Sequence, residues 1–327
     1  MKYAIIGSGA MGLRYGLTLK AAGNSVDFID SWPPQVKTIN RQGGVYVSYN
    51  GQNRHLVPIS VSYPKDYSGA AQILVFFVKQ YQLKKVLKLC SPWFNSSQYV
   101  LTAMNGMGHL EKFQHYFAKS KILAGTALIG TVLKKPGEID FMGKKGSESM
   151  NLVSPSAKPD AITTQVFSDL KQAGLHPKLQ TNLAGTLMGK FMINAVSNSL
   201  CTLFQIRLGE FISSPVAKNL GEPLVGEMFD VAERAGIKLL TTRRQEWQII
   251  ADSCRSLPLH YPSMYQDLIK HRKTEVDYLN GYIYDLGLKY HYQASLNNFL
   301  RNLVHLAEFN GNFDTQKFIQ QTLKKHI

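Results

Sequence analysis

The first thirty residues constrain the fold of this chain more than any other stretch. An apolar run from Lys2 to Ile6 leads directly into a glycine-rich turn, Gly7-Ser8-Gly9-Ala10-Met11-Gly12. A helical pattern then extends to Gly23, and a second apolar run, Val26 to Ile29, ends on Asp30. Strand, glycine turn, helix, strand and acid in this order are the pattern of a dinucleotide-binding βαβ unit. The alternative is an ordinary glycine-rich turn in an α/β protein.

Each glycine of the turn is expected to have a separate structural role. Gly7 permits a tight turn, Gly9 lets the backbone approach a pyrophosphate, and Gly12 lets the helix pack closely on the strand. The helix N-terminus offers N–H groups and a partial positive charge to the phosphates. The sequence therefore predicts that one run of residues binds the cofactor, with the pair after the second strand at its ribose: Gly7, Ser8, Gly9, Ala10, Met11, Gly12, Asp30 and Ser31.

Composition indicates a globular protein of two domains. The chain has 327 residues, of which 44% are hydrophobic and 18% are charged. No apolar run reaches the roughly 18 residues of a membrane span, and the apolar start leads into the glycine turn instead of a signal-peptide cleavage site. The cysteines Cys90, Cys201 and Cys254 are far apart and form no CxxC pair. We therefore expect no membrane association, no disulfide, no metal site and a cytoplasmic location.

The formal net charge of +15 suits anionic ligands. The lysines occur as separate pairs, for example Lys84-Lys85 and Lys324-Lys325, and they form no long basic stripe interleaved with aromatic residues. The charge therefore predicts a general attraction for anionic substrates and no binding of nucleic acid.

Strand and helix patterns alternate up to about residue 180. The run Ile73 to Val78 ends at Lys79, and Val100 to Met104 ends at Asn105. This alternation favours a parallel sheet with right-handed crossovers, and residues 126–153 are expected to add antiparallel strands. Beyond Thr181 helical patterns dominate. We therefore predict an α/β N-terminal Rossmann domain with a parallel sheet (residues 1–180) and an all-α C-terminal domain (residues 181–327).

A polar stripe runs along the helix predicted from Leu187 to Phe204. Lys190, Asn194 and Asn198 are spaced four residues apart, so they share one side of the helix. A lysine and two amides among apolar neighbours are costly unless a polar group meets them. The spacing indicates either a binding site or side chains that cap backbone groups at the domain junction.

A second polar segment follows Pro262. Ser263 is expected to cap a helix, with Gln266 at the capping-box position, and the helix is expected to continue through Glu275 to Gly281. Glu275 lies in the run Thr274-Glu275-Val276-Asp277-Tyr278-Leu279-Asn280-Gly281. Taken alone, Glu275 is typical of a solvated helix carboxylate beside Lys273.

Together these motifs resemble those of the ketopantoate reductases (2-dehydropantoate 2-reductases). The similarity rests on motifs that occur in the same order over nearly the whole chain: Gly7 to Gly12, Val78-Lys79, Asn105-Gly106-Met107-Gly108, the Lys190/Asn194/Asn198 stripe, and Ser263 with the run from Thr274 to Gly281. The resemblance implies a Rossmann domain, a helical domain and an active site between them. It implies reduction of ketopantoate to pantoate with a nicotinamide cofactor, a step of pantothenate biosynthesis.

The resemblance also assigns roles to single residues. Lys190 matches the catalytic lysine of the family, and a positioned ammonium can stabilise and protonate the oxygen that gains charge when hydride arrives. Asn194, Asn198 and Ser263 match substrate contacts, and Glu275 matches a glutamate that contacts cofactor or substrate. The remaining matches are to residues that line the cofactor: Lys79, Asn105 and Thr131.

Two positions depart from the family pattern. Where the family commonly has an arginine for the 2′-phosphate of NADP, this chain has Asp30-Ser31. The resemblance implies NADP(H), whereas a carboxylate at this place favours NAD(H) because it accepts hydrogen bonds from the ribose hydroxyls. An asparagine expected 18 residues after the catalytic lysine, a substrate contact in the family, is Leu208.

These observations leave three hypotheses. The first is a 2-oxo acid reductase that acts on ketopantoate, and the second is a reductase of the same fold for another 2-oxo acid, motivated by Leu208. The third is a non-catalytic dinucleotide-sensing protein, which would have no need of a proton donor such as Lys190. Assembly into a homo-oligomer is left open by the sequence.

Overall fold

A computed structural model describes residues 1–143, 149–154 and 158–312 of the chain. Contacts divide the chain into two compact units, Met1–Thr186, here called the N-terminal unit, and a helical unit that begins at Leu187. This division falls inside helix α6 (Leu183–Phe204). We propose the domain boundary at residues 180/181, because this point lies between β12 and α6 and leaves the helix whole.

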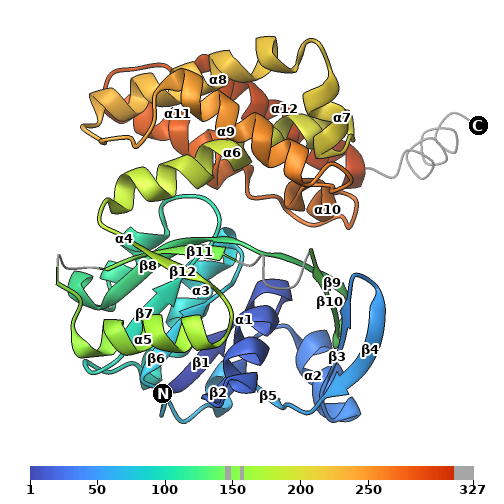
Figure 1. Cartoon of the computed structure of the whole chain (residues 1–327), viewed down its shortest axis with the longest axis vertical. Coiled ribbons are helices and arrows are strands. Elements are labelled where there is room, and N and C mark those ends of the chain that lie inside the picture. The colour runs from blue at the N-terminus through green and yellow to red at the C-terminus, as the bar shows by residue number, and fades with distance from the viewer. Residues whose placement is uncertain (144–148, 155–157, 313–327) are drawn as a thin grey trace, which may run out of the picture. The chain divides into compact units, whose positions relative to one another are not determined.

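The N-terminal unit is built on an eight-stranded sheet (Figure 1). Six neighbouring strands are parallel, β11 is antiparallel to β8, and β12 is parallel to β11 at the sheet edge. In spatial order the strands are β12 (Pro177–Gln180), β11 (Ser149–Val153), β8 (Ile122–Leu128), β7 (Tyr99–Thr102), β6 (Ile73–Phe76), β1 (Lys2–Ile6), β2 (Ser25–Ile29) and β5 (Val61–Ser62). The predicted parallel sheet is confirmed.

Both faces of this sheet are covered by helices, so its central strands are largely apolar. Along β1, Tyr3 and Ile5 pack with α1 (Ala10–Ala21), α2 (Pro33–Gln42) and α5 (Ala161–Gln172). Ala4 and Ile6, which alternate with them, pack with α3 (Gln80–Cys90) and α4 (His109–Gln114) on the other face. In the sheet, β2 lies on one side of β1 and β6 lies on the other, so the strand order reverses at β1. Ligands of such sheets bind at the point of reversal.

A second, four-stranded sheet of the N-terminal unit has the order β4 (Gln52–Val57), β3 (Val45–Tyr49), β10 (Glu138–Met142) and β9 (Gly130–Lys135). The hairpin between β3 and β4 turns at Asn50 and Gly51, whose φ values are 48° and 78°. Both residues take the left-handed conformation that this turn requires. Short 3-10 turns complete the unit: η1 (Pro64–Asp66), η2 (Ser91–Trp93) and η3 (Lys119–Lys121).

The helical unit contains no strand among the described residues, as the sequence predicts for residues 181–327. It consists of α6, α7 (Leu208–Ser213), α8 (Ala217–Arg234), α9 (Arg243–Ser256), α10 (Ser263–Leu268), the 3-10 turn η4 (Val276–Tyr278), α11 (Asn280–Lys289) and α12 (Ser295–Asn312). In Figure 1 these helices are coloured from yellow-green to red.

The helix predicted to run from Ser263 to Gly281 is wrong in two respects. Pro262 is the N-cap of α10 and Ser263 is its first helical residue, while the Gln266 side chain donates to the Tyr261 carbonyl. The helix ends at Leu268, and the chain turns at His271, whose φ is 51°. Proline fixes an extended cap conformation, and a left-handed residue cannot continue a helix.

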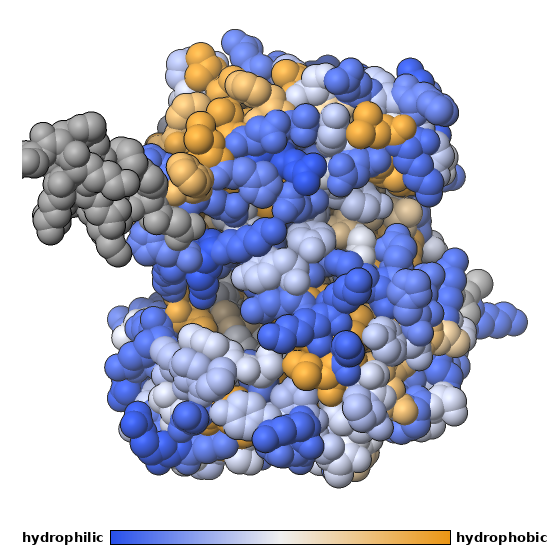
Figure 2. Space-filling model, turned by 180° about the vertical axis from the view of Figure 1, so that it is seen from behind, coloured by the Kyte–Doolittle hydropathy of each residue, from blue (hydrophilic) through white to orange (hydrophobic). Residues whose placement is uncertain are grey.

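Hydrophilic side chains are spread over both units on the face shown in Figure 2, with apolar areas between them. This distribution agrees with lysines that occur singly and in pairs along the sequence. Within the described parts of the chain, no helix has the length and apolar character needed to cross a membrane.

Candidate active site

The glycine turn lies directly between β1 and α1. Gly7 has a φ of 96°, and its N–H donates to the Ile29 carbonyl at 2.9 Å. Gly9 is the N-cap of α1, and no side chain caps this helix. The N–H groups of the first turn of α1 are therefore available to an anion, as the sequence predicts.

The space around the two later glycines of the turn differs sharply. A Cβ atom on Gly12 would lie 1.9 Å from the Gly7 carbonyl oxygen, whereas a Cβ atom on Gly9 would meet no described atom within 4 Å. Gly12 thus serves the packing of α1 on the turn. Gly9 leaves open space above the helix N-terminus, which fits the approach of a pyrophosphate.

Asp30 is bonded to the turn that it was expected to accompany. Its Oδ2 accepts a 2.6 Å hydrogen bond from the Ser8 N–H, and its Oδ1 accepts a 2.8 Å bond from the Trp32 N–H. Burial raises the pKa of Asp30, although these backbone hydrogen bonds act in the other direction. Each carboxylate oxygen has a second lone pair, so Asp30 can still accept from ribose hydroxyls. Ser31, its neighbour, is exposed.

Gln35 is a residue of this half that sequence reasoning missed. Its side chain is fully buried, donates from Nε2 to the Ser8 carbonyl at 2.5 Å, and accepts at Oε1 from the Gly137 N–H at 2.9 Å. The side chain of Ser8 is also buried and donates to the Ile29 carbonyl. Ser8 is therefore held inside the turn by its backbone as well as its side chain, and Gln35 joins it to the second sheet.

Two further predicted cofactor contacts follow the neighbouring strands β6 and β7. Lys79 is partly buried at the start of α3, and Asn105 is exposed in the turn before α4. The side chain of Gln80 joins these segments, because its Nε2 lies 2.9 Å from both the Asn105 carbonyl and His109 Nδ1. An amide nitrogen only donates, so His109 Nδ1 accepts and the imidazole is neutral.

Burial agrees with this protonation state, since it lowers the pKa of His109 to about 4, with a smaller effect of Lys112. Neither Gln80 nor His109 carried a signal in the sequence. Thr131, the last predicted cofactor contact in this unit, lies on β9 of the second sheet, where its hydroxyl donates to the Gly130 carbonyl at 2.8 Å.

The polar stripe of the helical unit lies on one continuous helix, α6. Asn194 and Asn198 are buried and Lys190 is partly buried. Burial lowers the pKa of Lys190 to about 8, and Cys254 of α9 opposes this shift in part. Among the described residues, the ammonium of Lys190 has no carboxylate in an ion pair and no hydrogen-bond acceptor. A cation placed in this way can bind an anion or give up a proton near neutral pH.

His260 also lies close to this lysine, and the sequence gave no reason to select it. Burial lowers the pKa of His260, and the positive charge of Lys190 lowers it further. The carbonyl of His260 accepts a 3.0 Å hydrogen bond from the N–H of Leu208, so the segment before α10 is tied to the start of α7. Leu208, the departure from the family pattern, is buried there.

Ser263 and Glu275 belong to separate elements of the helical unit. Ser263 is partly exposed at the first residue of α10, and Glu275 is buried just before η4. The structure connects the segment after Glu275 to α6 through Asn280, which is fully buried. Its Nδ2 donates to the Ala195 carbonyl at 3.1 Å.

Asn280 also contacts the hydroxyl of Ser199 and, at 3.1 Å, Oδ1 of Asn297 on α12. The asparagine therefore joins three helices. Asn280, a residue of the run from Thr274 to Gly281, thus has a structural role. No group of three or more potential metal ligands is present in residues 1–143, 149–154 and 158–312.

Most of the chain matches the two domains of one protein family. "Ketopantoate reductase PanE/ApbA" matches residues 3–152, and "Ketopantoate reductase PanE/ApbA C terminal" matches residues 182–308. The chain belongs to the ketopantoate reductase (PanE/ApbA) family. It is an NAD(P)-dependent oxidoreductase of this family that reduces a 2-oxo acid, and the glycine turn, the uncapped α1 and Asp30 fit a nicotinamide dinucleotide.

Relatives in sequence include the 2-dehydropantoate 2-reductase of Lactococcus lactis subsp. lactis, 32% identical over 94% of this chain and 98% of the relative. The same enzyme of Streptococcus pyogenes is 28% identical over 93% of this chain and 97% of the relative. Among solved structures, the ternary structure of D-mandelate dehydrogenase with NADH and anilino(oxo)acetate matches with a TM-score of 0.87 and 31% identity, over 96% of this chain and 100% of that chain.

Proposed function

We propose that this protein uses NADH to reduce a 2-oxo acid that carries an apolar group beside its ketone, with Lys190 as the proton donor. The observation that carries the proposal is the state of Lys190. It is a partly buried ammonium whose pKa burial lowers to about 8, and it shares one side of α6 with Asn194 and Asn198.

A bound nicotinamide would supply the hydride, and the residues of this chain would stabilise the charge that results. Negative charge develops on the carbonyl oxygen, where the Lys190 ammonium stabilises it and donates a proton. A lowered pKa makes the proton easier to give while the group is still charged at neutral pH. The amides of Asn194 and Asn198 orient the substrate, and Ser263 donates to its carboxylate.

Asp30 supports NADH as the cofactor. A carboxylate about 4 Å from a 2′-phosphate would cost on the order of 4 kcal/mol per unit of like charge at an effective dielectric constant near 20, less with salt screening. Ser31 could offer a single hydrogen bond in return. The related D-mandelate dehydrogenase structure contains NADH, which agrees with this assignment. Lys37 and Arg41 are the exposed cations of α2 that could offset the repulsion.

Leu208 supports an apolar substrate side chain. A leucine cannot hydrogen-bond the terminal hydroxyl of 2-dehydropantoate, which an asparagine at this position would do. Anilino(oxo)acetate, the molecule in the related D-mandelate dehydrogenase structure, carries a phenyl ring attached to its oxo carbon through a nitrogen. We infer that the substrate resembles phenylglyoxylate, or the analogue of 2-dehydropantoate that lacks its hydroxyl.

The second candidate is reduction of 2-dehydropantoate itself to pantoate. The relative from Lactococcus lactis favours it, at 32% identity over nearly the full length of both chains. A pocket lined by a leucine also rejects an added hydroxyl only weakly, by about 10²-fold at most. Both substrates can therefore turn over, and the two candidates differ in which one is preferred.

A panel of 2-oxo acids with NADH and NADPH tests the proposal. We expect the analogue without the hydroxyl to have a kcat/KM at least equal to that of 2-dehydropantoate, with NADH preferred. Leu208→Asn should shift the ratio toward 2-dehydropantoate by about tenfold, the value of one hydrogen bond, while the volume-conserving Leu208→Ile should leave it unchanged. A strong preference of the unaltered protein for 2-dehydropantoate would favour the second candidate.

A further inference from the structure

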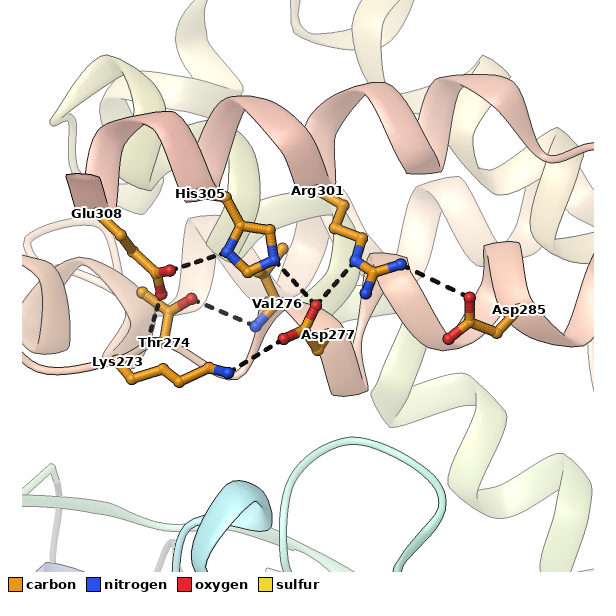
Figure 3. Close-up of polar contacts among 8 residues, drawn as sticks. All are labelled: Lys273, Thr274, Val276, Asp277, Asp285, Arg301, His305 and Glu308. Carbon is orange, nitrogen blue, oxygen red and sulfur yellow. Dashed lines mark hydrogen bonds and ion pairs between the residues drawn. The ribbon is translucent and has the colours of Figure 1, made fainter. Parts of the chain in front are cut away.

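A network of charged side chains joins the segment that carries Glu275 to helix α12 (Figure 3). Asp277 of η4 accepts a 2.8 Å hydrogen bond at Oδ1 from Arg301 Nε, and the same oxygen lies 2.9 Å from His305 Nε2. Its Oδ2 lies 3.4 Å from Lys273 Nζ. One carboxylate two residues after Glu275 is thus held by side chains of α12 and of the loop before η4.

The other side of the segment is fixed by Glu308 of α12. Its Oε1 accepts a 2.6 Å hydrogen bond from the backbone N–H of Thr274, the residue before Glu275. Its Oε2 lies 2.9 Å from His305 Nδ1. His305 therefore lies between the carboxylates of Asp277 and Glu308. Glu308 holds the residue before Glu275, and Asp277 lies two residues after it.

Both nitrogens of His305 face groups that only accept hydrogen bonds. Two ionised carboxylates can be satisfied together only by the imidazolium, because a neutral ring has a single N–H. Burial opposes protonation, but the hydrogen bonds to Glu308 and Asp277 prevail and raise the pKa of His305. The bridge is complete below this raised pKa and loses one hydrogen bond as the pH rises through it.

Acidic groups on the other helices packed against α12 have partners other than the imidazole. These are Asp285 of α11 with Arg301, Glu227 of α8 with the backbone N–H groups of Leu296 and Asn297, and Asp267 of α10 with Arg272. The groups that raise the pKa of His305 are Glu308 and Asp277. The cations Arg301 and Lys273 share the Asp277 carboxylate with the imidazole.

We propose that His305 is a positioning residue whose imidazolium form bridges Asp277 and Glu308 and thereby holds Glu275 where it contacts cofactor or substrate. This inference rests on the proposed function, which gives Glu275 that contact. The bridge acts on binding geometry, so its loss raises KM more than it lowers kcat.

The test compares the unaltered protein with His305→Gln at about pH 6 and about pH 9.5, on either side of the titration of a histidine. The ratio of their kcat/KM values removes every pH effect that both proteins share, including that of Lys190. We expect a ratio of about tenfold at the lower pH, the value of one charge-assisted hydrogen bond, that falls toward one at the higher pH. A ratio that is equal at both pH values overturns the proposal.

The matched control is His115→Gln, the same exchange at an exposed histidine of the N-terminal unit, which should give a ratio of one throughout. If His305→Gln does not fold, Glu308→Gln replaces it. That variant keeps an oxygen for the Thr274 N–H and removes one of the two negative charges. The NMR titration of His305 should then move to lower pH together with the pH dependence of KM. A titration that moves without a change in KM contradicts the proposal.

Hydrogen exchange of the Thr274 amide separates failure of this inference from failure of the proposed function. It needs no substrate, and at a common pH near 6 it should be faster in His305→Gln than in the unaltered protein. Unchanged exchange overturns the bridge even when 2-oxo acids turn over. Faster exchange in a protein that reduces no 2-oxo acid supports the bridge and refutes the function on which Glu275 depends.

Discussion

The candidate sites of the two units are built in different ways. In the N-terminal unit the candidate cofactor site is made mainly of backbone: an uncapped helix N-terminus, glycines and a carboxylate bonded to the turn itself. In the helical unit the candidate site is made of side chains held by other side chains, such as Asn280 and the bridge around His305. A site made of backbone needs glycines, because a side chain there would fill the space for the ligand. A site made of side chains needs neighbouring groups that hold those side chains in place.

The first prediction tests the glycine turn of the N-terminal unit. Gly12→Ala places a Cβ atom 1.9 Å from a carbonyl oxygen, so the N-terminal unit should lose about 3 kcal/mol or more of stability. Gly9→Ala meets open space and should fold normally, yet bind NADH at least about tenfold more weakly because the methyl group blocks the pyrophosphate. Thermal unfolding and calorimetric titration with NADH measure both effects. Equal behaviour of the two variants would contradict the separate roles.

The second prediction concerns the proton donor of the helical unit. Lys190→Ala should lower turnover by at least about 10²-fold, the lower end for loss of a general acid. NADH affinity should be nearly unchanged, because the glycine turn and Asp30, the proposed contacts to the pyrophosphate and the ribose, belong to the other unit. Lys218→Ala, at an exposed lysine of α8, serves as the control and should turn over normally. Near-normal turnover of Lys190→Ala would remove this lysine from the mechanism.

The third prediction sharpens the role of polar side chains in the helical unit. Asn198→Ala and Ser263→Ala should each weaken substrate binding by about 1–3 kcal/mol, the range for a hydrogen bond to a polar or charged group. Asn302→Ala, at an exposed asparagine of α12, should leave KM unchanged. If both site variants bind substrate as the unaltered protein does, the substrate lies against another face of α6.

The fourth and smallest effect concerns cofactor choice in the N-terminal unit. Asp30→Ala with Ser31→Arg should raise the ratio of kcat/KM for NADPH over NADH by about tenfold, because a repulsive charge is replaced by an attractive one. The ratio cancels any loosening of the turn, which loses the bonds of Asp30 to Ser8 and Trp32. Ser31→Arg alone is the control for the added cation. A natural tenfold preference for NADPH would show that Asp30 does not read the ribose.

The features that the sequence predicts correctly are those that depend on residues close together in the chain. The βαβ unit was visible because strand, turn and helix follow one another, and the stripe on α6 was visible because its residues are four positions apart. Gln35, the Gln80–His109 contact and His260 were missed because their partners are distant in sequence or carry no motif. The cap at Ser263 was wrong because Pro262 takes the capping position, a choice that local pattern left undecided.

The central claim is that Lys190 of α6 protonates the reduced substrate, and the pH dependence of kcat/KM for reduction tests it most directly. A proton donor must be charged, so activity should fall tenfold per pH unit above about 8, where burial places the pKa of Lys190. The residual activity of Lys190→Ala should lack this continuing decline and keep only the limited change, about tenfold in all, that the titration of His305 contributes. If the decline persists in Lys190→Ala, or if the unaltered protein keeps its full activity to about pH 10, where an unperturbed lysine titrates, another group gives the proton.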